Sequence, residues 1–156
     1  MINLKVGVND LGYDIFINNN YFKDISFENK ETVNVALKKL FNYVEENYKI
    51  KFHGFYKVKI YPSKLGIFIE IIKLDDDAYA SHNIDFRVVI IYNKDMYFKY
   101  EDYSLFDSEN VFFYNDYYYI NIKYIDNYIK YADMGSIVFI DDIDYEKCID
   151  IKNRKV

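Results

Sequence analysis

The clearest pattern along the chain is an apolar stripe that begins at Val33. Hydrophobic residues recur there at steps of three and four, at Val33, Ala36, Leu37, Leu40, Phe41, Val44 and Tyr48. This spacing places them on one side of a helix. Asn29 precedes the stripe and belongs to the residue types that are favoured at the N-cap. The pattern therefore predicts an amphipathic helix over residues 30–48.

A period of two follows the helix. In residues 56–74, "YKVKIYPSKLGIFIEIIKL", the strand before the turn has Val58 and Ile60 on one face and Lys57, Lys59 and Tyr61 on the other. After the turn, Ile67, Ile69 and Ile71 alternate with Phe68 and Glu70. Pro62 and Gly66 bracket the turn, and both residue types are favoured there. The segment is typical of a β-hairpin.

Residues 110–124, "NVFFYNDYYYINIKY", predict a second hairpin with Asn115 and Asp116 in its turn. Successive side chains of a strand point to opposite faces. We expect one face to pack on a core through Val111, Phe113, Tyr118, Ile120 and Ile122. We expect the other face to point outward with Phe112, Tyr114, Tyr117, Tyr119 and Asn121.

The rest of the second half predicts shorter elements. The β-branched run 84–92 is typical of a strand, and so is 136–140. Residues 125–135 have the spacing of a short helix, with Gly135 as its C-terminal stop. Residues 141–151 are compatible with a final helix or with an acidic tail.

These elements predict an α+β fold of two small units, each an antiparallel sheet with a hairpin packed by one or two helices. The first unit would span residues 1–74 and the second residues 84–156. Between them, residues 75–83, "DDDAYASHN", are polar and carry three successive acids. This segment is either a linker or a plain long loop.

The charge is uneven. Residues 1–77 carry eleven lysines and eleven acids, so the whole net charge of −5 falls on the second half. An acidic surface disfavours nucleic-acid binding, which needs clustered Lys and Arg. Base stacking by the aromatic hairpin and mimicry of a nucleic acid remain minority alternatives. Acidity suits a protein partner with a basic surface.

Candidate chemistry is sparse. The chain has two histidines, His53 and His82, and one cysteine, Cys148, without a nucleophile signature around them. No acidic segment has the ligand pattern of a calcium loop, and no Gly-rich phosphate loop is present. We therefore expect no enzymatic activity, no metal and no cofactor. A single cysteine and the lack of an apolar run of about 18 residues indicate a cytoplasmic, non-membrane protein.

The order of these features resembles the MecA family of adaptor proteins. The helix "ETVNVALKKLFNYVEENYKIKF" followed by the first hairpin is similar to that family's N-terminal domain. The segments "FRVVIIYNKDMYF", "SENVFFYNDYYYINI" and "ADMGSIVFIDDIDYEKCI" are similar to its C-terminal domain. This chain is shorter, and its acidic linker is reduced to residues 75–83.

The resemblance implies a non-enzymatic adaptor. Its N-terminal part would hold substrate proteins, and its C-terminal part would dock on the N-domain of a Clp-type AAA+ unfoldase such as ClpC. The alternative is a small acidic inhibitor or immunity-type protein, encoded by a phage or mobile element, that blocks a basic site on an enzyme. For either partner we expect the contact surface to consist of Phe112, Tyr114, Tyr117, Tyr119, Asp141, Asp142 and Asp144, because tyrosine buries a large area and keeps a polar tip.

Overall fold

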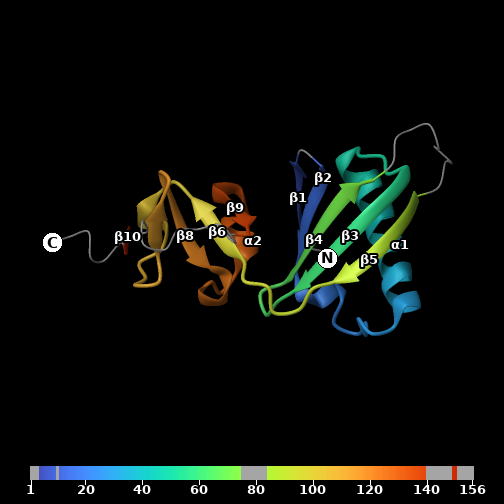
Figure 1. The fold of residues 1–156 in the computed structure, drawn as a ribbon, viewed down its shortest axis with the longest axis horizontal. Helices are drawn as coiled ribbons and strands as arrows, with labels where there is room; N and C mark the ends of the chain where they lie inside the picture. The colour runs from blue at the N-terminus through green and yellow to red at the C-terminus, as the bar shows by residue number, and fades with distance from the viewer. Residues whose placement is uncertain (1–3, 10, 75–83, 140–148, 151–156) are drawn as a thin grey trace. The chain divides into compact units, whose positions relative to one another are not determined.

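The computed structural model describes residues 4–9, 11–74, 84–139 and 149–150. The chain divides into two compact units, Met1–Asn93 and Lys94–Val156. Each unit has its own β-sheet, as Figure 1 shows. The α+β class expected from the sequence is confirmed.

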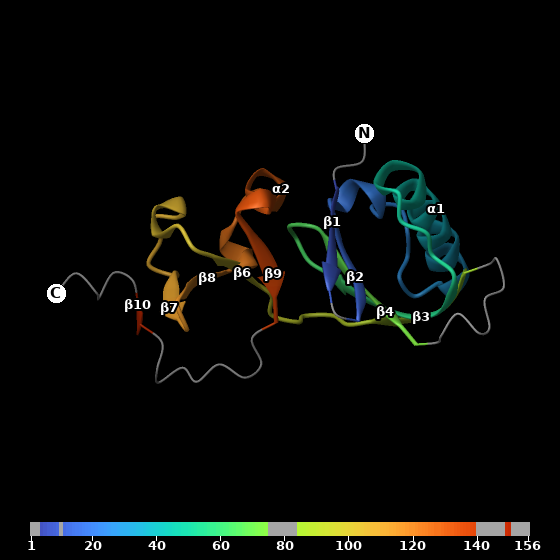
Figure 2. The same cartoon turned by 90° about the horizontal axis from the view of Figure 1, so that it is seen from above.

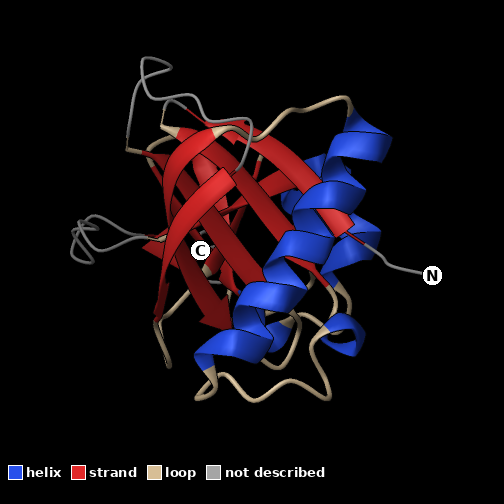
Figure 3. Cartoon of the chain, turned by 90° about the vertical axis from the view of Figure 1, so that its right-hand side faces the viewer, coloured by secondary structure: helices blue, strands red, loops and turns tan. Residues whose placement is uncertain are grey.

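The first unit combines a five-stranded mixed sheet with one long helix. Its main elements are β1 (Leu4–Asn9), β2 (Gly12–Ile17), α1 (Lys30–Tyr48), β3 (Gly54–Pro62), β4 (Ile67–Lys73) and β5 (Ile84–Ile90). The strand order is β1-β2-β4-β3-β5, and every neighbouring pair is antiparallel except β3 and β5, which are parallel. The helix lies along one face of the sheet (Figures 2 and 3).

The apolar stripe of the sequence is the buried side of α1. Its buried residues are Val33, Ala36, Leu37, Leu40, Phe41 and Val44. They pack with strand residues on the facing side of the sheet, among them Ile15, Ile17, Val58, Ile60, Ile67, Ile69 and Ile71. Asn29 caps the helix, because its side chain accepts hydrogen bonds from the amides of Glu31 and Thr32. The predicted helix and its cap are both confirmed.

The strand at 84–92 belongs to the first sheet and not to the second unit, where we expected it. β5 pairs with β3 over its whole length, from Gly54 opposite Ile84 to Ile60 opposite Ile90. The unit boundary accordingly falls after Asn93. The first sheet is therefore mixed, which corrects the expectation of a purely antiparallel sheet.

The second unit is built on four antiparallel strands, with short helices beside them. In chain order its elements are β6 (Tyr97–Tyr100), a 3₁₀ helix (Tyr103–Leu105), β7 (Phe112–Tyr114), β8 (Tyr117–Asn121), a 3₁₀ helix (Ile122–Tyr124), α2 (Tyr128–Tyr131), a 3₁₀ helix (Ala132–Met134), β9 (Gly135–Val138) and β10 (Ile149–Asp150). The order is β7-β8-β6-β9, and the two-residue β10 adds at the β7 edge.

The aromatic hairpin forms as predicted. Tyr114 pairs with Tyr117 across a two-residue turn. Asn115 and Asp116 have φ angles of 50° and 71° there. A two-residue type I′ turn, whose twist matches that of the flanking strands, needs positive φ at both central residues. Asn and Asp tolerate positive φ better than most residues.

The helix expected over 125–135 is shorter in the structure. Only Tyr128–Tyr131 is α-helical, and a 3₁₀ helix continues from it. Gly135 does not stop this helix in a left-handed conformation but opens β9, with extended backbone at φ 179°. A Cβ atom there would collide with the Lys99 carbonyl and come within 2.8 Å of the Phe98 ring. Glycine is needed at this position for close approach between β9 and β6.

Candidate functional site

The residues expected on the outward side of the second hairpin share one face of the sheet. Phe112 pairs with Tyr119, and Tyr114 pairs with Tyr117, across β7 and β8. Directly paired residues of antiparallel strands project to the same side. The neighbouring strand β6 adds two more residues there. We call the following set the aromatic face: Tyr97, Lys99, Phe112, Tyr114, Tyr117 and Tyr119.

The core of the second unit lies on the opposite side of this sheet. The strand residues that point there are Phe98, Tyr100, Phe113, Tyr118, Ile120 and Ile137. Phe106 and Tyr128 pack edge-on against the Phe98 ring at centroid distances of 6.0 and 5.7 Å. Because the buried rings and the short helix α2 contact this side, the sheet has one core side and one aromatic face.

Tyr119 is buried, which corrects the expectation that its side chain points into solvent. It is 6% exposed, and Phe112 stacks on it with a ring separation of 5.4 Å and an interplanar angle of 14°. Tyr119 lies on β8, between β7 and β6, so side chains from both neighbours cover it. Phe112, Tyr114 and Tyr117 remain partly exposed. The accessible aromatic surface therefore belongs to β7 and to the turn end of β8.

Lys99 provides the positive charge of the aromatic face. Its Nζ atom lies 4.0 Å from the centroid of the Tyr117 ring. An ammonium group over an aromatic face is attracted by the ring quadrupole. The contact restricts the positions of both side chains and keeps the aromatic face from being purely apolar.

Asn121 was expected to point outward and is instead 9% exposed. Its side-chain oxygen accepts a hydrogen bond of 3.0 Å from the Lys123 amide, and its side-chain nitrogen donates one of 3.4 Å to Asp95. Asn121 thus caps the 3₁₀ helix that follows β8. Its role is local structure and not surface recognition.

The acidic part of the predicted contact surface, Asp141, Asp142 and Asp144, lies outside the described residues. Within them, Asp102 is an acidic group of the second unit whose side chain makes two hydrogen bonds. Its carboxylate accepts hydrogen bonds from the Ser104 hydroxyl and amide at 2.6 and 3.0 Å. These bonds lower the pKa of Asp102 below its usual value, because they favour the charged form.

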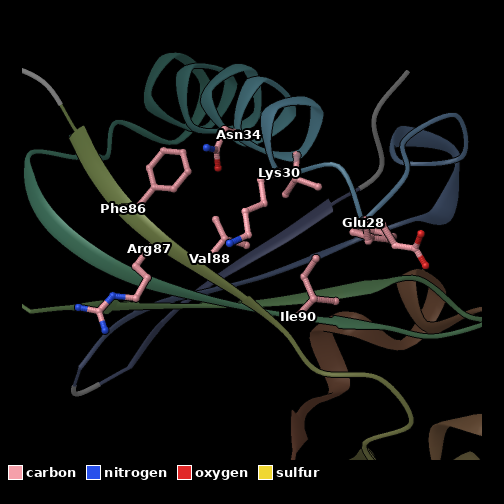
Figure 4. A pocket seen from close by; sticks show the side chains of 9 residues that line it. Glu28, Lys30, Asn34, Phe86, Arg87, Val88 and Ile90 are labelled. Atoms are coloured by element: carbon pink, nitrogen blue, oxygen red, sulfur yellow. The ribbon is translucent and has the colours of Figure 1, made fainter.

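The first unit contains a pocket that we did not expect from the sequence. It has a volume of about 370 Å³ and lies between the start of α1 and the edge strand β5. Figure 4 shows the side chains that line it, which are Phe27, Glu28, Lys30, Val33, Asn34, Phe86, Arg87, Val88 and Ile90. The alternation of Phe86, Val88 and Ile90 was visible in the sequence, but only the pairing of β5 with β3 places these residues at a sheet edge.

In the parts of the chain that the structure describes, no cluster of His, Cys, Asp and Glu with metal-binding geometry occurs. His53 precedes β3, and its amide lies 3.4 Å from the Tyr56 hydroxyl. His82 and Cys148 lie outside the described residues. Among the helices described, none is long and apolar enough to cross a membrane.

Comparisons with known proteins give no match to a family model, a curated protein or a solved structure. The functional argument for this chain therefore starts from its own surfaces, which are the aromatic face and the pocket beside β5.

Proposed function

We propose that this protein is a non-enzymatic protein-interaction module that docks a partner through the aromatic face of its second unit. The observation that carries the proposal is the grouping of Tyr97, Phe112, Tyr114 and Tyr117 on the sheet side opposite the core, with Lys99 over the Tyr117 ring. Aromatic side chains are enriched in interfaces because each buries a large area at low cost in conformational entropy.

Contacts among the aromatic side chains indicate that the aromatic face is preformed before a partner binds. Tyr97 packs edge-on against Phe112 at 5.8 Å, and Phe112 stacks on the buried Tyr119. Lys99, on the neighbouring strand β6, lies over the Tyr117 ring of β8 and restricts its position. Side chains that are ordered before binding lose less entropy on association, so a larger share of the contact energy contributes to affinity.

We further propose that the module is an adaptor, whose second unit binds the N-domain of a ClpC-type unfoldase and whose first unit holds substrate proteins. The helix α1 followed by the β3–β4 hairpin supports this proposal, since it matches the order of elements in the MecA resemblance. An acidic second half also favours association with a basic protein surface.

Titration calorimetry of the full chain with the purified N-domain of a ClpC-type unfoldase tests the adaptor proposal. We expect binding by the wild type and a loss of at least about tenfold in the double variant Tyr114→Ser, Tyr117→Ser. Tyr103→Ser is the matched control, because Tyr103 is 63% exposed in the same unit but is not part of the aromatic face. Absence of wild-type binding would refute the adaptor proposal.

Co-purification of the full chain from its own cells tests the coarser proposal independently of that partner. We expect mass spectrometry to identify a protein that the wild type and Tyr103→Ser both retain and that the double tyrosine variant loses. Equal recovery of every partner by all three proteins would exclude the aromatic face as the docking surface. Recovery of a basic enzyme in place of an unfoldase would favour the acidic-inhibitor alternative.

A further inference from the structure

The first unit has a sheet edge that is well suited to accept another strand. β5 is the last strand in the order β1-β2-β4-β3-β5, and among the described residues no strand pairs with its outer side. It is seven residues long and reads "IDFRVVI". Exposed sheet edges are usually short, or carry Pro, bulges or inward-pointing charges that prevent further pairing. β5 has no Pro, and its one central charge, Arg87, is on the sheet side away from α1.

The backbone of β5 is oriented for pairing. The Ile91 amide donates a 2.8 Å hydrogen bond to the Ile60 carbonyl of β3. Alternate residues of a strand direct their N–H and C=O groups to opposite sides, so those of Val89 also point toward β3. The N–H and C=O groups of Phe86, Val88 and Ile90 therefore point to the outer edge. Each is a strong donor or acceptor that an added strand would satisfy.

The pocket beside β5 extends this edge into a binding groove. Phe86, Val88 and Ile90 line it from β5, and its other apolar lining residues are Val33 of α1 and Phe27, which precedes α1 in the chain. A strand added to β5 would project alternate side chains into this space. The groove therefore selects apolar residues at every second position of its occupant.

The charges around the groove favour particular residues at the alternate positions of the occupant, whose side chains point away from the groove. Figure 4 shows Lys30 extending from the first turn of α1 toward β5, and Arg87 pointing to the other side of the sheet. Glu28 is the acidic residue among those that line the groove. The part of the edge around Val88 is thus basic on both sides. An acidic residue on the added strand beside Arg87 would form a favourable cross-strand pair.

We propose that the β5 edge binds an extended peptide segment of a partner protein, in which apolar residues alternate with acidic ones. The peptide adds as a sixth strand to the first sheet, places its apolar side chains between β5 and α1, and directs acidic side chains toward Arg87. This site lies in the first unit and is independent of the aromatic face.

Selection of displayed random peptides against the full chain tests this proposal. The peptides are seven residues long, the length of β5. We expect the enriched sequences to alternate apolar with acidic residues. Fluorescence anisotropy then measures the affinity of the most enriched peptide for each variant. Val88→Pro is expected to weaken binding about tenfold, because it removes one outward-pointing N–H.

A matched proline separates this loss from unfolding. The Val88 amide points away from β3, so Val88→Pro keeps the β3–β5 hydrogen bonds and is expected to lower the melting temperature only through the packing that the partly buried Val88 side chain loses. Val89→Pro removes an amide that points toward β3 and is expected to lower the melting temperature further. Arg87→Glu, at an exposed side chain, is expected to shift the preference of the selected peptides from acidic to basic residues.

Three results would overturn the proposal. The first is a selection without any enriched sequence. The second is equal affinity of the enriched peptide for the wild type and Val88→Pro. The third is a wild-type dimer in sedimentation velocity that Val88→Pro converts to a monomer, since the edge would then be occupied by a second copy of this chain.

Discussion

The Nζ atom of Lys99 lies 4.0 Å from the centroid of the Tyr117 ring, across neighbouring strands of the second sheet. This contact joins the one cation of the aromatic face to its most turn-proximal β8 tyrosine. It is therefore both a stabilising interaction of the second unit and part of the proposed docking surface.

A double-mutant cycle on this pair should give a coupling free energy of about 0.5–1 kcal/mol, the usual range for a partly exposed cation–π contact. The variants are Lys99→Met, Tyr117→Leu and the double variant, and the measurement is urea unfolding of each. Effects of the two single variants that simply add would show that the contact contributes nothing to stability.

Tyr100→Phe should stabilise the second unit. Tyr100 is 1% exposed, and no hydrogen-bond partner reaches its hydroxyl in the described residues. Removing a buried unpaired hydroxyl relieves a desolvation cost of about 1 kcal/mol or more. Urea unfolding at neutral pH measures the gain. Tyr118→Phe is the control, because Tyr118 is only partly buried.

Tyr100 should also make stability fall in alkali. Burial raises the pKa of Tyr100 far above its usual value, and the nearby Tyr118 and Asp102 charges raise it further. The native state therefore keeps this proton, while the unfolded chain loses it above about pH 10. The contribution of Tyr100 to the free energy of unfolding is accordingly complete below that pH and declines above it. The decline from Tyr100 approaches about 1.4 kcal/mol per pH unit.

The measurement for this pH effect compares unfolding free energies of the wild type and Tyr100→Phe from about pH 8 to about pH 11. The other tyrosines are present in both proteins, so the difference between the two curves reports Tyr100 together with its coupling to Tyr118. Parallel curves over the whole range would show that Tyr100 ionises freely in the native state.

Local signals explain what could be predicted from the sequence. The bounds of α1 follow from an apolar period that a helix alone satisfies and from a capping residue, Asn29, next to it. The second hairpin follows from Asn115 and Asp116, which tolerate the positive φ angles of its turn. The face assignment within β7 and β8 follows from the alternation of strand side chains.

The remaining features depend on non-local contacts. The run 84–92 fits either sheet, and only its parallel pairing with β3 assigns it to the first unit. The burial of Tyr119 results from neighbours on two other strands, and alternation alone does not encode their size. Glycine is a common residue type at the end of a helix, which is why Gly135 was predicted as a helix stop. In the structure, glycine is needed at this position because β9 passes close to Lys99 and Phe98 of β6. The pocket beside β5 was missed because it also depends on the pairing of β5 with β3, which the sequence alone does not assign.

Asn29→Ala should destabilise the first unit by about 1 kcal/mol. The Asn29 side chain accepts hydrogen bonds from the Glu31 and Thr32 amides at 3.1 and 3.3 Å, and alanine leaves both without this acceptor. Thermal unfolding measures the loss, and Asn29→Asp should retain stability because it keeps the acceptor.

Asn42→Ala is the matched control for the cap. Asn42 is exposed within α1, so alanine there should stabilise the helix by about 0.5 kcal/mol through its higher helix propensity. The same substitution should therefore have opposite signs at the two asparagines. Two changes of the same sign would contradict a capping role for Asn29.

Two glycines of the β1–β2 hairpin should respond differently to alanine. Gly12 begins β2 with a φ angle of 159°, and a Cβ atom there would collide with the Ile71 carbonyl of β4. Gly12→Ala must therefore push β2 away from β4, at a cost of about 1–3 kcal/mol. Gly7, on β1, has nothing within 4 Å of the corresponding position, so Gly7→Ala should be neutral or stabilise by about 0.5–1 kcal/mol. Urea unfolding of both variants measures the difference, and equal effects would show that β2 does not approach β4 this closely.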